Sequence, residues 1–258
     1  MLQRQALSIL KTGVNVFLTG EPGAGKSHTI REYVSFLRSC GVEPAITAST
    51  GIAATHIGGM TIHSWSGIGI NKTLNRYELA EIATRDKLVR RVKATRVLII
   101  DEISMLDGRT LGLVDLVCKT VRGSEQPFGG LQVVLVGDFF QLPPVGRDGD
   151  IVQFAFDADV WRGAGFTTCY LSEQHRQEDE TFLGILSALR SGEVTDDHRD
   201  QLIERRATSA GKMTKLFPHN ADVDRINATE LAKLPGKPTT FTMRHHGAKP
   251  LVEQIMRG

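Results

Sequence analysis

The sequence predicts an α/β fold in which helices cover both faces of a parallel β-sheet. Short runs of apolar and β-branched residues alternate along the chain with longer runs whose apolar residues recur at helical spacing. The strand-like runs are apolar throughout, which is typical of parallel strands buried on both faces. In such sheets ligands bind at the carboxyl ends of the strands, and the polar motifs of this chain follow its strands.

The expected elements alternate regularly over the first half of the chain. They are helix 2–11, strand 14–19, helix 27–39, strand 44–49, helix 75–93, strand 96–100, helix 107–121 and strand 131–136. After residue 177 the pattern changes: helices are predicted at 182–190, 196–206 and 222–234, and strands at 214–217 and 239–243. We expect a first domain at 1–190, then connecting helices and the incomplete start of a second domain at 191–258. The roughly 40 residues from the predicted strand at 214 onward are too few for an ordinary α/β domain.

Composition narrows the class of protein. The 258 residues are 41% hydrophobic and 23% charged, which is typical of a globular chain, and the net charge of +2 permits a nucleic-acid partner without requiring one. Cys40, Cys118 and Cys169 have no metal-ligand spacing, and we expect them to be buried apolar residues rather than disulfide or zinc ligands. The absence of a long apolar run or a signal-peptide pattern predicts a soluble intracellular protein with no membrane partner.

The segment GEPGAGKS at residues 20–27 predicts a phosphate-binding loop. Glycines at this spacing, between a predicted strand and helix, let backbone N–H groups turn toward the phosphates of a nucleoside triphosphate. Lys26 is expected to reach the β- and γ-phosphates, and Ser27 to ligate Mg²⁺. The alternative is a glycine-rich turn with an incidental lysine, which the strand-loop-helix context makes very improbable.

Two acidic residues follow the apolar run at 97–100. Asp101 is expected to hold Mg²⁺, directly or through water, and Glu102 to orient and deprotonate the attacking water. A solvated acidic turn is the common alternative, but it is improbable beside a phosphate-binding loop. The cofactors predicted from both motifs are therefore ATP and Mg²⁺.

A third buried strand leads into GDFFQLPPV. It ends in Gly137 and Asp138, with Gln141 just beyond. An uncharged amide at this position could touch the γ-phosphate and respond to its presence. Taken alone, Gln141 would be an ordinary polar loop residue, and only its neighbours favour the functional role.

Five segments together resemble a known family. TGEPGAGKS, TASTGIAATHIGGMTIHSW, IIDEISML, PFGGLQVVLVGDFFQLPPV and LSEQHRQ, in this order, are similar to the Pif-type (petite integration frequency) DNA helicases of superfamily 1, from residue 3 to about 190. The resemblance implies a RecA-like P-loop ATPase that couples ATP hydrolysis to 5′-to-3′ movement on single-stranded DNA. It also implies a role in DNA repair, recombination, replication or telomere maintenance.

The resemblance adds roles around the nucleotide. Gln3 would contact the adenine and Arg176 the γ-phosphate, although each could also be an ordinary surface residue. The catalytic residues would be Lys26, Glu102, Gln141 and Arg176. The residues expected to bind the nucleotide are Gln3, Gly20, Gly23, Ala24, Gly25, Lys26, Ser27, His28, Asp101, Gln141 and Arg176.

The segment that follows the second strand would contact DNA. Small hydroxyl, backbone and imidazole groups suit sequence-independent binding to sugar and phosphate, and an indole can stack on a base. For Trp65 a core position is an equally good alternative, and His63 could be a buried histidine. The expected DNA-binding residues are Thr50, Gly51, Thr61, His63, Ser64 and Trp65.

The carboxyl-terminal part departs from the family pattern. We find neither a second arginine in an S-R dipeptide nor the later motifs of a complete motor, so we expect a chain truncated in its second RecA-like domain. Two hypotheses follow: the motor core of a 5′-to-3′ helicase, or an ATP- and single-stranded-DNA-binding module that does not unwind. A P-loop adaptor for protein partners is a third class.

The expected partners are single-stranded and tailed duplex DNA, bound by a monomer. The compartment would be the nucleoid-containing cytoplasm of a bacterium, or the nucleus or mitochondrion of a eukaryote.

Overall fold

The computed structural model describes residues 1–144, 153–173, 179–205, 214, 216–217, 219–236, 239 and 241. Contacts divide the chain into two compact units, Met1–Arg199 and Asp200–Gly258, which we describe separately. The predicted boundary at 190/191 falls before α10 (Asp196–Glu204), whereas the boundary between these units falls within it.

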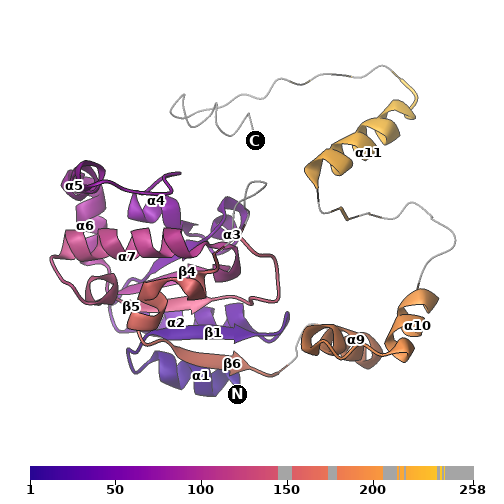
Figure 1. Cartoon of the computed structure of the whole chain (residues 1–258), viewed down its shortest axis with the longest axis horizontal. Coiled ribbons are helices and arrows are strands. Elements are labelled where there is room, and N and C mark those ends of the chain that lie inside the picture. The colour runs from indigo at the N-terminus through magenta and orange to yellow at the C-terminus, as the bar shows by residue number, and fades with distance from the viewer. Residues whose placement is uncertain are drawn as a thin grey trace. The chain divides into compact units, whose positions relative to one another are not determined.

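The first unit contains a parallel sheet, as predicted, and the sheet has six strands rather than the four expected from the sequence (Figure 1). Its strands are β1 (Val16–Gly20), β2 (Ala45–Ala48), β3 (Met60–Thr61), β4 (Val97–Asp101), β5 (Gln132–Val136) and β6 (Thr167–Leu171). Their order across the sheet is β3-β2-β4-β5-β1-β6, and every pair is parallel. Strand β1 is therefore an interior strand, with β5 on one side and the edge strand β6 on the other.

Successive residues of the central strands enter two different cores. Leu98 and Ile100 of β4 belong to the hydrophobic cluster on one face, and Val97 and Ile99 belong to the cluster on the other. Side chains alternate across a strand, so a strand apolar at every position is buried on both faces. This explains the continuous apolar runs in the sequence.

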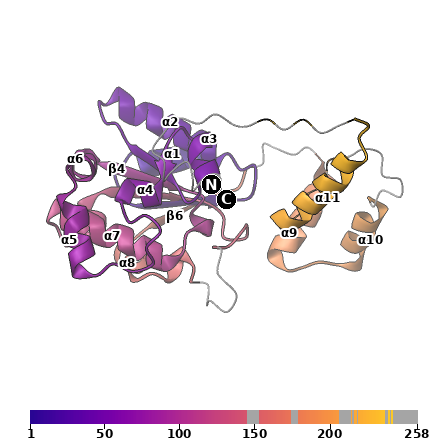
Figure 2. The same ribbon diagram turned by 90° about the horizontal axis from the view of Figure 1, so that it is seen from above.

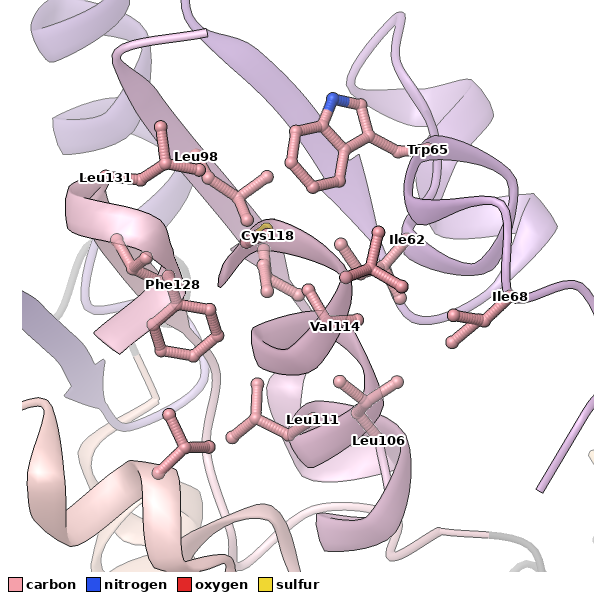
Figure 3. Packing of buried hydrophobic residues seen from close by; sticks show 14 of the residues in the cluster. Ile62, Trp65, Ile68, Leu98, Leu106, Leu111, Val114, Cys118, Phe128 and Leu131 are labelled. Carbon is pink, nitrogen blue, oxygen red and sulfur yellow. The ribbon is translucent and has the colours of Figure 1, made fainter. Parts of the chain in front are cut away.

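Helices supply the other half of each core. Helices α1 (Gln3–Leu10) and α2 (Lys26–Ser39) cover one face, while α4 (Ile62–Ser66), α6 (Asp86–Ala94) and α7 (Gly108–Arg122) contribute to the other, part of which Figure 3 shows. Helix α5 (Arg76–Thr84) also packs on α7 (Figure 2). The remaining elements are α3 (Gly51–His56), η1 (Ile103–Met105), η2 (Pro127–Gly130), η3 (Ala155–Asp157), α8 (Asp159–Gly163) and α9 (Glu180–Ser191).

The helix predicted at 75–93 is two helices. Asn75 caps α5 through a capping box with Glu78, but Arg85 adopts an extended backbone, φ −73° and ψ 100°, which ends α5 and starts α6. The predicted pattern missed this break because Arg85 carries no turn signal. It also missed β3, α3, α4, α8 and the edge strand β6, whose exposed Thr167, Thr168 and Tyr170 interrupt the apolar run.

The second unit is described chiefly through α11 (Asn220–Ala232), close to the helix predicted at 222–234. The described residues Thr214, Leu216 and Phe217 are not in a strand, contrary to the prediction for 214–217. Of the strand predicted at 239–243, only Thr239 and Phe241 lie within the described residues, and neither is in a strand.

Two of the three cysteines are buried as expected. Cys118 and Cys169 lie in the cores, and burial raises the pKa of Cys118 to about 12, which keeps its thiol protonated. Cys40 is exposed, contrary to the prediction, because it follows the last turn of α2 rather than facing the sheet. Within the described part of the chain, every helix is too short or too polar to cross a membrane.

The double-sided burial of β4 predicts a large cost for truncating it. Ile99 is fully buried, so we expect Ile99→Ala to lower the free energy of unfolding by about 2–5 kcal/mol. Ile52 on α3 is 77% exposed, and Ile52→Ala should change it by less than about 0.5 kcal/mol. Urea titrations followed by the fluorescence of Trp65 and Trp161, both in this unit, would measure the difference; equal effects of the two substitutions would contradict the double-sided core.

Candidate functional site

The strand order brings the predicted motifs to one edge of the sheet. The phosphate-binding loop follows β1, the acidic pair ends β4, Asp138 follows β5, and Thr50 follows β2. Since β2, β4, β5 and β1 are consecutive neighbours, the carboxyl ends of four parallel strands lie side by side. The motifs separated in sequence thus form one site.

The backbone of the phosphate-binding loop favours glycine at three places, Gly20, Gly23 and Gly25, which all have a positive φ. Gly25 precedes α2 in a left-handed conformation, φ 86°, and a Cβ there would overlap the side-chain amide of Gln3. At Gly20 a Cβ would lie 2.5 Å from the carbonyl oxygen of Leu171 on β6. The loop therefore packs tightly between β6 and the residue predicted to contact adenine, and Gln3 Nε2 lies 3.4 Å from the carbonyl oxygen of Ala24.

The lysine of the loop is held by the loop itself. Lys26 Nζ donates hydrogen bonds to the carbonyl oxygens of Gly20, at 2.7 Å, and Glu21, at 3.2 Å. Burial lowers the pKa of Lys26, while the negative charges of Asp138 and Glu102 oppose this shift. The ammonium is thus partly desolvated among three carboxylates, counting Asp101, and suited to meet a triphosphate.

The acidic pair lies in a partly buried position at the end of β4. Burial raises the pKa of Asp101, and burial together with the charge of Asp101 raises the pKa of Glu102. The backbone of Glu102 is left-handed, φ 53° and ψ 45°, a conformation that costs a non-glycine residue about 1–3 kcal/mol. Such strain persists only where surrounding contacts enforce it.

Two of those contacts are local, since the N–H of Glu102 donates to Asp101 Oδ1 at 2.9 Å and its carbonyl oxygen accepts from the N–H of Met105 at 3.1 Å. Two more come from the segment after β2. The backbone N–H of Ser49 donates to the carbonyl oxygen of Asp101 at 3.1 Å, and Ser49 Oγ donates to the carbonyl oxygen of Glu102 at 2.8 Å. Ser49 is buried. The ladder between β2 and β4 thereby continues by one residue into the acidic pair.

Asp138 is buried and satisfied by three donors. Arg190 of α9 donates to its Oδ2 at 2.8 Å, Gln141 Nε2 to the same oxygen at 3.2 Å, and the backbone N–H of Phe140 to Oδ1 at 3.2 Å. Burial would raise the pKa of Asp138, but these hydrogen bonds outweigh it and hold the pKa below its ordinary value. The Arg190 guanidinium also lies over the Phe140 ring, 4.3 Å from its centroid.

A cavity of about 1100 Å³ opens beside these groups. Ser27, Asp101, Glu102 and Gln141 line its polar end, and it continues between α2 and α3. Among the described residues no cluster of three or more His, Cys, Asp or Glu side chains could hold a metal unaided. Ser27 and Asp101 suit Mg²⁺, which commonly takes one or two protein ligands and completes its shell with water and nucleotide phosphates.

The predicted DNA-binding hydroxyls lie at the starts of two short helices. Thr50 accepts from the N–H of Ala53 at the start of α3, and Thr61 Oγ1 accepts from the N–H of Ser64 at the start of α4. Gly51 and Ser64 are exposed. Burial lowers the pKa of His63, partly opposed by Asp107, which favours its neutral form.

The expectation that Trp65 offers a stacking surface is corrected by its position. Its side chain is only 1% exposed and lies in the core with Ile62 (Figure 3). Arg91 of α6 fixes the same helix by donating to the carbonyl oxygens of Ser64, at 3.0 Å, and Trp65, at 2.5 Å. Burial of the apolar indole surface stabilises the fold more than its exposure would, so Trp65 anchors α4 in the core.

Two of the predicted site residues, Arg176 and His28, remain. Arg176 lies outside the described residues. His28 lies on the exposed side of α2, where its Nε2 is 3.6 Å from Glu32 Oε1. Ser49, Arg91 and Arg190 were not among the predicted residues, because single side chains of this kind carry no motif. Only the polar character of Ser49, between two apolar segments, could have suggested a role for that residue.

Known proteins match the chain over most of its length. A family model described as PIF1-like helicase matches residues 3–200. The ATP-dependent DNA helicase Pif1 of Psychrobacter sp. is 46% identical over 100% of this chain and 41% of its own length. The ATP-dependent DNA helicase RRM3 of Saccharomyces cerevisiae is 41% identical over 88% of this chain and 33% of its own length.

Solved structures of Pif1 helicases are also similar to this chain. Pif1 helicase from Candida albicans superposes with a TM-score of 0.84 at 35% identity, covering 99% of this chain and 60% of that one. Pif1 helicase from Bacteroides, in complex with ADP-AlF3 and ssDNA, superposes with a TM-score of 0.76 at 32% identity, covering 91% and 57%. The chain spans less than half the length of the two curated relatives, 41% of the Psychrobacter Pif1 and 33% of the Saccharomyces cerevisiae RRM3.

The Asp138–Arg190 pair predicts a pH-dependent stability. Arg190→Met leaves a buried carboxylate with fewer donors, so we expect it to cost roughly 3 kcal/mol of unfolding free energy at pH 7. In the wild type the stabilisation from Asp138 is present above the ordinary pKa of aspartate and is lost as the pH falls through its lowered pKa. In the variant burial dominates and protonation relieves the cost, so the gap between the two proteins should narrow on acidification.

Urea titrations at pH 7 and pH 4 would measure that gap. Arg199→Met is a matched control, since Arg199 pairs with Asp196 at the surface and its loss should cost less than about 1 kcal/mol. A gap for Arg190→Met that stays constant or widens at pH 4 would contradict the assignment to Asp138.

Proposed function

This chain belongs to the PIF1-like helicase family, and on that premise we propose that it is the ATP-hydrolysing motor part of an ATP-dependent DNA helicase. The family membership supports a substrate pair of ATP and DNA, since the relatives are named ATP-dependent DNA helicases. One solved neighbour is described as bound to ssDNA and a nucleotide analogue. The proposal concerns what this chain's own residues do.

The observation that carries the proposal is the convergence of three motifs on Lys26. The ammonium feels the charges of Asp138 from the segment after β5 and of Glu102 and Asp101 from the end of β4. Three distant segments therefore meet where phosphate would bind. A structural lysine would need one carboxylate partner, whereas this arrangement suits a cation that exchanges its own loop carbonyls for a triphosphate.

The residues around the proposed nucleotide site would have different roles. The loop from Gly20 to Ser27 would hold the phosphates by backbone N–H groups at the start of α2, and Gln3 would lie against the base. Ser27 and Asp101 would hold Mg²⁺, which neutralises phosphate charge. Glu102 would orient the attacking water and accept its proton.

Gln141 and Asp138 connect this chemistry to α9. Gln141 shares the Asp138 carboxylate with Arg190 and lines the cavity beside Glu102. A γ-phosphate that attracted the Gln141 amide would compete with Asp138 for the same donor. We propose that Gln141 responds to the phosphate in this way, and that Arg176 adds a guanidinium to the transition state.

The DNA would bind at the ends of β2 and β3. Thr50, Gly51, Thr61, His63 and Ser64 offer hydroxyl, backbone and neutral imidazole donors at one surface of the first unit, and such groups suit sugar and phosphate rather than base edges. We propose single-stranded DNA as the ligand, with 5′-to-3′ movement and tailed duplexes as the substrates of the whole protein. DNA repair, recombination or telomere maintenance would be its setting.

Two substitutions test the nucleotide site. Lys26→Ala should abolish binding of Mg²⁺-ATP and phosphate release, because no other described cation occupies the loop. Glu102→Gln should retain nucleotide affinity but slow phosphate release by about 10²-fold or more, as expected for loss of a general base. Phosphate release with and without an oligothymidine, and affinity for a fluorescent ATP analogue, would measure both.

Lys87→Ala, which removes an exposed lysine on α6, is the control and should behave as the wild type. Binding of nucleotide and oligothymidine without any phosphate release would favour the non-hydrolysing module over the motor. Wild-type phosphate release by Lys26→Ala would contradict the proposed site. Absence of oligonucleotide binding at low salt, where phosphate contacts are strongest, would instead favour an adaptor for protein partners.

A further inference from the structure

The segment that leads to the proposed DNA-binding residues is bonded directly to the acidic pair. Ser49 lies between β2 and Thr50, and it makes two hydrogen bonds to consecutive carbonyl groups across the sheet. Its N–H donates to Asp101 and its Oγ to Glu102, at 3.1 Å and 2.8 Å. No intervening side chain separates the two functional segments.

The second of these bonds falls on a strained residue. Glu102 has a left-handed backbone although it is not glycine, and its carbonyl is the acceptor of the Ser49 hydroxyl. A left-handed residue persists where its neighbours enforce it. The Glu102 carbonyl is held by the Ser49 hydroxyl together with the N–H of Met105, so the Ser49 contact helps to set the direction of the Glu102 side chain. A displacement of Ser49 therefore alters the carboxylate proposed to orient water.

The residues on the other side of Ser49 are those proposed to meet DNA. Thr50 follows directly and caps α3, and Gly51 begins that helix and is exposed. Phosphate contacts at these two residues would fix the backbone that positions the Ser49 hydroxyl. The proposed DNA contacts and the geometry at Glu102 therefore both depend on one buried residue, Ser49.

We propose that Ser49 is a positioning residue that couples single-stranded DNA binding to the nucleotide site by holding the backbone of Glu102. This inference rests on the proposed function, because it needs both ligands to bind. Bound DNA would favour the arrangement in which Ser49 holds the backbone of Glu102. Bound Mg²⁺-nucleotide, in contact with the Glu102 side of this bond, would favour the same arrangement. Coupling of this kind is reciprocal between the two ligands.

Thr47 provides a matched control on the same strand. Its Oγ1 donates to the carbonyl oxygen of Ile99 at 2.7 Å, so it too connects β2 to β4 by a buried hydroxyl. The acceptor of that bond lies two residues before the acidic pair, and the bond involves neither Glu102 nor the residues proposed to bind DNA. Thr47→Val removes a similar hydrogen bond without disturbing Glu102.

The test is the factor by which DNA changes nucleotide affinity. The Kd of the chain for a fluorescent, non-hydrolysed ATP analogue with Mg²⁺ would be measured without and with saturating oligothymidine. In the wild type the ratio should fall within the range of about 5 to 150 that is usual for coupled sites. Ser49→Ala should bring it to within about twofold of one, and Thr47→Val should keep the wild-type ratio.

A near-isosteric second variant, Ser49→Cys, keeps a weak donor and should give an intermediate ratio. Urea titrations of all variants would identify one that does not fold. The proposal is overturned if Ser49→Ala or, should that variant not fold, Ser49→Cys keeps the wild-type ratio. It is also overturned if Thr47→Val loses coupling equally, or if the wild type binds both ligands without coupling. Failure of the wild type to bind Mg²⁺-nucleotide or oligothymidine would instead remove the proposed function and the inference with it.

Discussion

Because β1, β4 and β5 are buried on both faces, their backbone groups can find hydrogen-bond partners only in neighbouring strands, and this determines the register in which their carboxyl ends meet. The pairing of Leu18 with Val136 and of Ile100 with Leu135 sets the phosphate-binding loop, the acidic pair and Asp138 at one edge. A slip of one residue would send every side chain of a strand to the opposite core. The packing of the two cores therefore determines the relative positions of the groups around Lys26.

The site concentrates charge in a partly desolvated place, and each charge is compensated differently. Asp138 keeps a low pKa through three donors, whereas burial raises the pKa values of Asp101 and Glu102. The anionic form of Asp138 is thus favoured, and its carboxylate accepts hydrogen bonds from Gln141 and Arg190. The acidic pair has fewer donors, since only Asp101 Oδ1 accepts a hydrogen bond, from the N–H of Glu102 at 2.9 Å, among the bonds described for the two carboxylates. We therefore expect both carboxylates to gain stabilisation when cations approach.

The fold and the nucleotide site were largely predictable because both depend on local pattern. Continuous apolar runs identify buried strands, and the spacing of Gly20, Gly25 and Lys26 identifies a loop whose backbone must turn tightly. Edge strand β6 and the break at Arg85 were not predictable, since pairing with β1 and packing on α7 override weak local signals. Trp65 was ambiguous because an indole suits a core as well as a base.

The same distinction explains why the connecting residues escaped prediction. Ser49, Arg91 and Arg190 act through contacts with residues 26 to 53 positions away in sequence, and single side chains of this kind leave no periodic or motif signal. PFGG shows the converse: its specific sequence serves a structural turn, with Phe128 left-handed and buried and its N–H bonded to Asp115. Both left-handed non-glycine residues among those described, Glu102 and Phe128, are held by a buried polar side chain. The left-handed Phe128 lies in the core, whereas the left-handed Glu102 lies between the two proposed ligand sites, where a change in its backbone would have a functional consequence.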